Sequence, residues 1–262
     1  MTVMAAPSQP VGTLLREWRE RRRLSQLELS IQASISTRHL SFVETGRSRP
    51  TPEMIVRLTE QLDVPLRERN QLLLAGGYAP AYPQHALDAP ELAEVRRAMR
   101  LILDAHSPYP ALVIDRWWTM LDANTAIPAL IEGCAPHLLE PPINVLRLTL
   151  HPDGLAPRIA NLAQWRGHLL ERVRHRVSAT GDSRLTDLLD ELHGYPGGTQ
   201  PTPAPLSSDV VLPLRLRTAA GELAMFTVSA AVETAADVTV QELVVESFYP
   251  ADESTAMALR GL

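Results

Sequence analysis

The sequence contains no lysine and a single cysteine, and each scarcity excludes a kind of chemistry. All 25 basic residues are arginine, which excludes mechanisms that need a lysine amine, such as a Schiff base, pyridoxal phosphate or a P-loop lysine. Cys134 cannot form an internal disulfide, which fits a reducing cytoplasm. No run approaches the ~20 apolar residues that span a bilayer, and the first residues lack the pattern of a secretion signal. We therefore expect a cytoplasmic protein with no membrane segment.

Sequence motifs of the common enzyme classes are also missing. We find no HExxH, CxxC, GxSxG, GxGxxG or Walker pattern. His168 and His175 are seven positions apart and do not share a helical face well enough for a metal pair. Cys134 has no obvious base beside it. We predict no catalytic residue, no metal site and no cofactor.

The charge is distributed unevenly along the chain. The net charge of −5 argues against a protein that coats nucleic acid. Residues 1–80, however, hold 11 arginines against 8 acidic residues, whereas residues 81–262 hold 14 against 22. The mildly basic N-terminal part is thus the part expected to meet phosphate.

Residues 11–80 are predicted to form an all-α domain of five short helices, after a flexible tail over residues 1–10. Apolar spacing predicts a first helix over 11–22. Ser25 and Glu28 form the pattern of a capping box at the start of the second helix. Ser36 is the expected cap of a third helix over 36–45, which Gly46 ends. Two further helices are expected to start near Thr51 and at Pro65.

Two short helices joined by a tight turn are suited to entering a major groove of DNA. The segment LSQLELSIQASISTRHLSFVETGRSRPTPEMIVRLTEQLDV resembles the helix-turn-helix of the large XRE class of regulators, also called Cro/C1-type. A helical bundle that binds no DNA is the alternative for this segment.

The resemblance implies roles for individual residues of the second and third helices. Arginine is the usual bidentate reader of guanine, and arginines after the recognition helix commonly hold phosphates. The implied base-reading residues are Thr37, Arg38, Ser41 and Phe42, and the implied phosphate contacts are Gln26, Ser36, Arg47 and Arg49. Each arginine could instead be a solvated surface charge.

Two features depart from the usual XRE pattern. Ser34 replaces a glycine in the turn, where a positive φ is common, so a slightly strained turn is expected. Leu27 and Ile31 form an apolar pair where the class is usually polar. They pack against the first helix or belong to an interface.

After a linker and connecting helix over residues 81–105, residues 106–262 are predicted to form an α+β domain. Glycine, proline and tyrosine from Gly76 to Pro83 mark the linker, and its helix, from about residue 90 to 105, joins the two domains or supports a dimer. Strands are expected at 111–115, 117–122, 210–217, 223–231 and 243–248, helices at 155–179 and 185–193, and a loop at 194–208. This order suggests one antiparallel sheet with helices on one face.

The C-terminal domain resembles the MmyB-like regulators. The segments that carry this resemblance are PALVIDRWWTMLDAN, NVLRLTLHPDGLAPRIANLAQW, DELHGYP and VQELVVESFYPADESTAMALR. The resemblance implies a PAS-like ligand-binding domain and a small, largely apolar effector, for which an acidic, fatty-acid-like molecule is one candidate. The residues by themselves predict a sheet with a helical cover that is able to enclose a pocket.

Six residues are candidates for the effector pocket: Trp117, Trp118, Asn124, Arg147, His151 and Trp165. Arg147 lies in an apolar run, and a buried arginine needs an anion, so it could anchor an acidic ligand or pair with Asp153 or Glu246. The tryptophans are alternatively plain core residues. Asn124 could orient a strand-to-helix turn, and His151 could be structural.

These observations predict a transcription regulator that binds a double-stranded DNA operator as a homodimer, with two recognition helices in successive major grooves of a palindrome-like site. An effector in the C-terminal pocket would change the affinity for DNA. The alternatives are a C-terminal domain that binds a protein partner or only dimerises, and an enzyme joined to a helix-turn-helix. A buried Arg147 in a closed cavity would favour a ligand, and a broad exposed apolar patch near the last strand would favour a partner.

Overall fold

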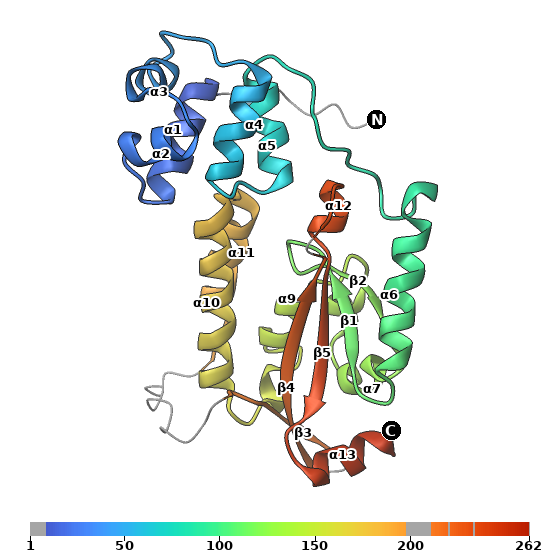
Figure 1. Cartoon of the computed structure of the whole chain (residues 1–262). Coiled ribbons are helices and arrows are strands. Elements are labelled where there is room, and N and C mark those ends of the chain that lie inside the picture. Colours follow the sequence, from blue (N-terminus) through green and yellow to red (C-terminus); the bar gives the residue numbers. More distant parts are fainter. Residues whose placement is uncertain (1–8, 198–210, 220, 233, 262) are drawn as a thin grey trace. The chain divides into compact units, whose positions relative to one another are not determined.

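The computed structural model describes residues 9–197, 211–219, 221–232 and 234–261 (Figure 1). The chain divides into two compact units, one formed mainly by residues up to His85 and the other mainly by residues from Ala86 onward. Residues 1–8 of the predicted tail and most of the predicted loop at 194–208 lie outside the described residues. Among the described residues, no helix has both the length and the apolar character needed to cross a bilayer.

The N-terminal unit is built from the five helices that the sequence predicts. They are α1 (Val11–Arg21), α2 (Gln26–Gln32), α3 (Thr37–Glu44), α4 (Pro52–Gln61) and α5 (Leu66–Ala75). The predicted capping box is present, since the Ser25 hydroxyl accepts from the Glu28 amide and the Glu28 carboxylate accepts from the Ser25 amide. These bonds provide acceptors for backbone N–H groups that have no partner within the first turn of a helix.

The core of this unit explains why the helices meet at fixed positions. Leu15, Leu29, Leu40, Ile55 and Leu58 are completely buried. A Cβ atom at Gly12 would lie 2.1 Å from the carbonyl oxygen of Val43, so only glycine lets α1 approach the end of α3 so closely. Ser34 has a φ of +53°, which confirms the positive φ expected in the turn between α2 and α3.

The C-terminal unit contains one five-stranded antiparallel sheet, as expected for the α+β fold. Its strands are β1 (Ala111–Ile114), β2 (Met120–Ala123), β3 (Leu214–Thr218), β4 (Gly221–Ala231) and β5 (Val244–Pro250), in the order β2-β1-β5-β4-β3. The helical segments are η1 (Pro90–Leu92), α6 (Ala93–Ala105), α7 (Ile127–Ile131), α8 (Pro136–Leu139), α9 (Val145–Leu150), η2 (Ala156–Arg158), α10 (Leu162–Thr180), α11 (Ser183–Gly194), α12 (Val238–Gln241) and α13 (Glu253–Arg260).

Helices cover both faces of this sheet rather than one. Leu112 and Ile114 of β1 belong to the large core, which also contains Trp165 and Leu169 of α10. The alternate residues of β1 pack on the other side, where Leu103 of α6 meets Val113 (Figure 1). The connecting helix α6 is therefore part of the C-terminal fold.

The predicted strand at 117–122 is wrong at its start. Trp117 and Trp118 lie in a turn, and β2 begins only at Met120. The Asp115 carboxylate accepts the amide N–H groups of Trp117 and Thr119, each at 2.8 Å, which closes the turn. Trp118 has a φ of +61°. A local side-chain hydrogen bond thus overrides the strand preference of the aromatic residues.

The predicted helix over 155–179 is interrupted and begins only at Leu162. Ile159 is extended and forms a bridge with Leu216, and the Ala160 amide donates to the carbonyl of Arg215 at 2.7 Å. Pairing with the sheet edge therefore replaces the first turns of the predicted helix. The sequence also did not predict α8, α9, α12 or α13.

Candidate DNA-binding face and effector cavity

The exposed face of α3 carries the residues implied to read bases. Leu40 and Val43 are buried, so the opposite side of α3 is free to meet a ligand. Arg38 is exposed there, whereas Thr37, Ser41 and Phe42 are partly buried. The Thr37 hydroxyl is 2.8 Å from the Ser30 hydroxyl, a contact that links α3 to α2. The Ser36 hydroxyl accepts from the His39 amide, so its role in the unit is to cap α3.

Phe42 stands beside two arginines. The guanidinium carbons of Arg38 and Arg47 lie 5.3 and 5.9 Å from the centre of its ring. Such distances suit cation–π contacts, which hold flexible arginines near an apolar surface. The exposed Arg38 and Arg47 thus form a positive patch around an aromatic ring, and DNA phosphates and base edges are ligands of matching charge.

Behind this face lies a buried polar network. Arg19 donates from Nε and from a terminal nitrogen to the two oxygens of Glu44, at 2.7 and 2.9 Å. The side-chain amide nitrogen of Gln26 donates to the same carboxylate at 2.8 Å. Since an amide nitrogen carries two hydrogens, Gln26 keeps a donor for a phosphate while Glu44 fixes the orientation of its side chain.

Arg49 is tied to the end of α5. Its guanidinium donates to the carbonyl of Gly76 at 2.8 Å and lies 5.1 Å from the ring centre of Tyr78. These contacts give Arg49 a structural role within the unit, whereas Arg47 has no such tie to α5 among the described contacts. Of the two arginines implied to hold phosphate, Arg47 is therefore the freer one.

The C-terminal unit contains an apolar cavity of about 70 Å³ between the sheet and helices α7, α9 and α10. Roughly 10–15 Å³ suffices to hold one water molecule, so this space can hold more than one. All five strands contribute to its wall. The lining residues are Leu112, Met120, Ile127, Leu130, Ile131, Val145, Leu146, Leu148, Thr149, Leu155, Trp165, Leu169, Arg172, Leu214, Leu216, Thr227, Glu246 and Phe248.

One ion pair stands in this apolar wall. Arg172 of α10 contacts the Glu246 carboxylate at 2.6 Å, and the Glu246 side chain is only 7% exposed. Among the described residues, the indole nitrogen of Trp165 and the hydroxyl of Thr227 are buried without a hydrogen-bond partner. Unpaired polar atoms are costly in a protein interior, and a polar group of a ligand would satisfy them.

Of the six predicted pocket residues, Trp165 lines the cavity, and the other five lie elsewhere in the described structure. Arg147 is 45% exposed and pairs with Glu191 at 2.6 Å, not with Asp153 or Glu246. The prediction of a buried Arg147 was wrong because residues 145–150 form a helix, which directs Leu146 and Leu148 inward and Arg147 outward. The hydrogen bond from Arg147 lowers the pKa of the Glu191 carboxyl.

The remaining candidates have structural contacts. Asn124 accepts from the Ala111 amide and donates to the carbonyl of Tyr109, so it orients the turn after β2. Trp117 donates to the Asp182 carboxylate at 2.8 Å. Trp118 is fully buried under Arg176. His151 lies in the turn after α9, and its ring is 5.0 Å from that of Tyr195.

Sequence reasoning missed Arg172 and Thr227 as cavity residues and treated Glu246 as a partner for Arg147 or as part of an anionic surface. A signal for Glu246 did exist. Residues 244, 246 and 248 share one face of a strand, and the neighbours of Glu246 on that face are apolar. An acidic residue on the buried face of a strand needs a cation, which is Arg172 here.

Cys134 is buried, and burial raises the pKa of its thiol. A raised pKa keeps the thiol protonated at neutral pH, whereas a nucleophilic cysteine needs the thiolate.

Comparison with known families gives two matches. The family model described as MmyB-like transcription regulator ligand binding domain matches residues 95–262, and the model described as helix-turn-helix domain matches residues 10–72. The first match covers more than half of the chain. The chain belongs to the MmyB-like transcription regulators. Its N-terminal part is thus a helix-turn-helix domain, and its C-terminal part is the ligand-binding domain of that family.

One curated relative and one solved structure give further matches to this MmyB-like regulator. RghRB, an HTH-type transcriptional regulator of Bacillus subtilis (strain 168), is 35% identical over 83 residues, which are 31% of this chain and 58% of RghRB. The chain thus spans less than two thirds of that relative. A solved RNA-binding light-oxygen-voltage receptor matches 99% of this chain and 62% of its own, with 13% identity and a TM-score of 0.31, too low to show a shared fold.

Proposed function

We propose that the protein acts in the cytoplasm as a homodimeric regulator that reads a palindrome-like operator, and that a small, largely apolar effector changes its affinity for DNA. The observation that carries this proposal is the cavity of the C-terminal unit. Its wall is apolar except for Arg172, Glu246 and two threonines, and two buried polar atoms in it have no partner among the described residues. Apolar pockets with a few polar groups are typical of sites for small ligands.

For the N-terminal unit we propose that Thr37, Arg38, Ser41 and Phe42 face base edges. Arg38 is exposed on α3, and its guanidinium can make the bidentate contact that guanine favours. Gln26, Ser36 and Arg47 would hold the phosphate backbone. Arg49 would contribute less to phosphate binding than Arg47, because Gly76 already accepts hydrogen bonds from it.

The effector that fits best is a compact apolar molecule with one polar end. If that end is acidic, Arg172 replaces Arg147 as the proposed anchor, because Arg172 lines the cavity. Glu246 would then compete with the acid for the same guanidinium. The indole N–H of Trp165 and the hydroxyl of Thr227 are donors that could bind a ligand oxygen.

Homodimerisation is supported by exposed apolar side chains of the C-terminal unit. Leu101 and Ile102 of α6, Val228 of β4 and Tyr249 of β5 are exposed. The ring of His106, which follows α6, lies 4.7 Å from the ring of Tyr249, so α6 and β5 meet at this surface. An exposed apolar surface is also what the alternative, a different protein partner, would need.

The first test is native mass spectrometry of the purified full-length protein, followed by denaturing extraction of any bound molecule. We expect the mass of a dimer with a small apolar molecule released on extraction. That molecule should change the affinity of the protein for its operator in a fluorescence anisotropy titration. An empty dimer whose affinity for DNA no small apolar molecule changes would support the alternative, in which the C-terminal unit binds a protein or only dimerises.

A variant pair shows whether the cavity is the effector site. Leu169→Phe adds volume inside the cavity, whereas Met257→Phe adds a ring on the exposed side of α13. We expect Leu169→Phe to abolish effector binding with little change in operator affinity, and Met257→Phe to leave both unchanged. Equal effector binding by both variants would place the effector elsewhere.

A further inference from the structure

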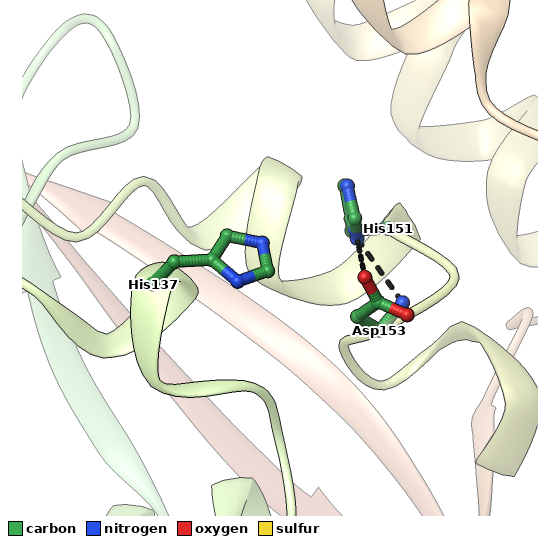
Figure 2. Close-up of side chains that lie close together, drawn as sticks. All are labelled: His137, His151 and Asp153. Carbon is green, nitrogen blue, oxygen red and sulfur yellow. Dashed lines mark hydrogen bonds and ion pairs between the residues drawn. The ribbon is translucent and has the colours of Figure 1, made fainter.

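Two histidines and an aspartate from separate segments meet at the surface of the C-terminal unit. His137 comes from α8, and His151 and Asp153 come from the turn after α9 (Figure 2). One nitrogen of each imidazole and one oxygen of the carboxylate all lie within 4.8 Å of one another. Imidazole nitrogens and carboxylate oxygens are common ligands of transition-metal ions.

The turn that carries two of these groups is held tightly. The Gly154 amide donates to the carbonyl of His151 and the Leu155 amide to the carbonyl of Leu148, both at 2.9 Å. A Cβ atom on Gly154 would lie 2.2 Å from the carbonyl oxygen of Leu148, so only glycine fits. The segment before α8 is attached to the same turn, because the Ala135 amide donates to the carbonyl of Asp153 at 2.9 Å. The backbone thus places the three side chains next to one another.

The contacts of His151 place its Nδ1 as a hydrogen-bond acceptor. Nδ1 accepts a hydrogen bond from the Asp153 amide at 3.1 Å, so Nδ1 carries a lone pair. The same nitrogen lies 3.8 Å from a carboxylate oxygen of Asp153 (Figure 2). Two ligand atoms that are each about 2.0–2.2 Å from one metal ion can be separated by this distance. A metal ion between them would displace the amide hydrogen bond.

We propose that His137, His151 and Asp153 form a binding site for a divalent transition-metal ion such as Zn²⁺, with water in the remaining coordination positions. Two imidazoles favour zinc, nickel or copper over magnesium and calcium, which prefer oxygen ligands. His137 and Asp153 are exposed and His151 is partly buried, so an ion can reach the site from solvent.

The metal site adjoins the wall of the cavity. Leu148 and Thr149 precede His151 and Leu155 follows Asp153, and all three line the cavity. Ile131, which also lines it, lies a few residues before His137. A bound metal ion would fasten the two wall segments to each other. By linkage, an ion that favours one arrangement of the wall changes the effector affinity, and the effector changes the metal affinity by the same factor.

The test is isothermal titration calorimetry. Tag-free, full-length protein that has been treated with a chelator is titrated with ZnCl₂. We expect one Zn²⁺ per chain, and we expect His137→Ala, His151→Ala and Asp153→Asn each to weaken binding at least about tenfold, the lower end of what loss of even a supporting residue costs at metal sites. His175→Ala is the matched control, since His175 is exposed on α10 and outside the cluster. It should bind like the wild type.

Visible absorption spectroscopy with Co²⁺ gives a second measurement, which does not rely on the heat of binding. Binding at this site should produce visible absorption bands of an imidazole- and carboxylate-bound ion, and the bands should disappear in the three variants. All variants must retain the wild-type Tm in chelator. A wild-type protein without saturable Zn²⁺ binding, or variants that bind as the wild type does, would overturn the proposal. Neither result would bear on the proposed regulation by an effector, because effector binding and operator affinity are measured in the presence of chelator.

Discussion

The two units of this regulator differ in how completely their buried polar and charged side chains are hydrogen-bonded around the site that each contains. In the N-terminal unit, both oxygens of Glu44 are bonded, to Arg19 and Gln26, and Arg19 also donates to the carbonyl of Leu24. In the C-terminal unit, the pair of Arg172 and Glu246 borders a cavity, and the indole nitrogen of Trp165 lacks a partner among the described residues.

The functions proposed for the two units account for the difference. In the proposed function α3 presents its side chains to DNA, and the bonded network of Arg19, Glu44 and Gln26 behind it would keep them in place. A sensing unit must take a ligand inside, so part of its interior has to stay open in the free protein. A complete hydrogen-bond network therefore suits the reading of DNA, and an incomplete one suits the uptake of a ligand. Five predictions, from the largest expected effect to the smallest, test this contrast.

Removal of Glu44 should have the largest effect. The Glu44 side chain is 1% exposed, so Glu44→Ala leaves a buried Arg19 without its carboxylate, at a cost of about 3–5 kcal/mol in the free energy of unfolding. Such a loss is comparable to the stability of a small domain. We expect loss of operator binding while effector binding persists, measured by urea unfolding and anisotropy.

The control for this prediction is Glu20→Ala. Glu20 is 52% exposed and pairs with Arg16 on the surface of α1, and solvent screens such a pair, so its loss should change stability little. If Glu44→Ala were as stable as Glu20→Ala, the network behind α3 would not be what holds the recognition helix in place.

Removal of Arg172 should destabilise the C-terminal unit less. Arg172→Met leaves Glu246 buried without its cation, and loss of a hydrogen bond to a charged group costs about 1.5–3 kcal/mol. The double variant Arg172→Met/Glu246→Leu removes both charges, so it should regain most of that stability. A double-mutant cycle on urea unfolding measures the coupling. Additive losses would mean that the two residues do not stabilise each other.

The third prediction concerns recognition by α3. Arg38→Ala should lose about 1–3 kcal/mol of discrimination at one base pair, whereas Arg47→Ala should weaken binding to all sequences and reduce the slope of log affinity against log salt by about 0.9. Competition titrations with single-base operator variants at several salt concentrations separate the two effects. An equal loss on every operator for Arg38→Ala would argue against base reading by this residue.

The same contrast explains which features could be predicted from the sequence. The face of α3 depends on local signals, namely the Ser36 cap, the buried Leu40 and Val43, and the positive φ at Ser34. Each of these acts within a few residues, so periodicity and capping rules suffice. The five helices and the antiparallel sheet were predicted for this reason.

The cavity could not be predicted in this way, because its wall combines residues from Leu112 to Phe248. Arg147 and Arg172 illustrate the difficulty. Arg147 stands in an apolar run but faces solvent, because the run is a short helix. Arg172 stands in a charged helix but faces Glu246 across the unit. Which arginine reaches the cavity is decided by long-range contacts that one sequence does not display.

The smallest effect is expected for Arg147→Ala, which tests this distinction directly. Arg147 and Glu191 are both partly exposed, at 45% and 35%, so solvent screens the pair and its loss should cost less than about 1 kcal/mol. The effector affinity should not change, whereas Arg172→Met should weaken binding of an acidic effector. Equal effector losses in the two variants would mean that both arginines act on the ligand.

The pair of Arg147 and Glu191 also predicts a pH dependence of this small effect. The folded-state pKa of Glu191 lies below its ordinary value because Arg147 donates to the carboxylate. A group with a lowered folded pKa stabilises the protein above its unfolded pKa, about 4.3 for glutamate, and loses that contribution as the pH falls through the folded pKa. The wild type and Arg147→Ala should therefore differ in stability at neutral pH and converge in acid, as urea unfolding between neutral and acidic pH would show. A difference that persisted undiminished in acid would have to come from contacts of the arginine stem, because the protonated carboxyl no longer attracts the guanidinium.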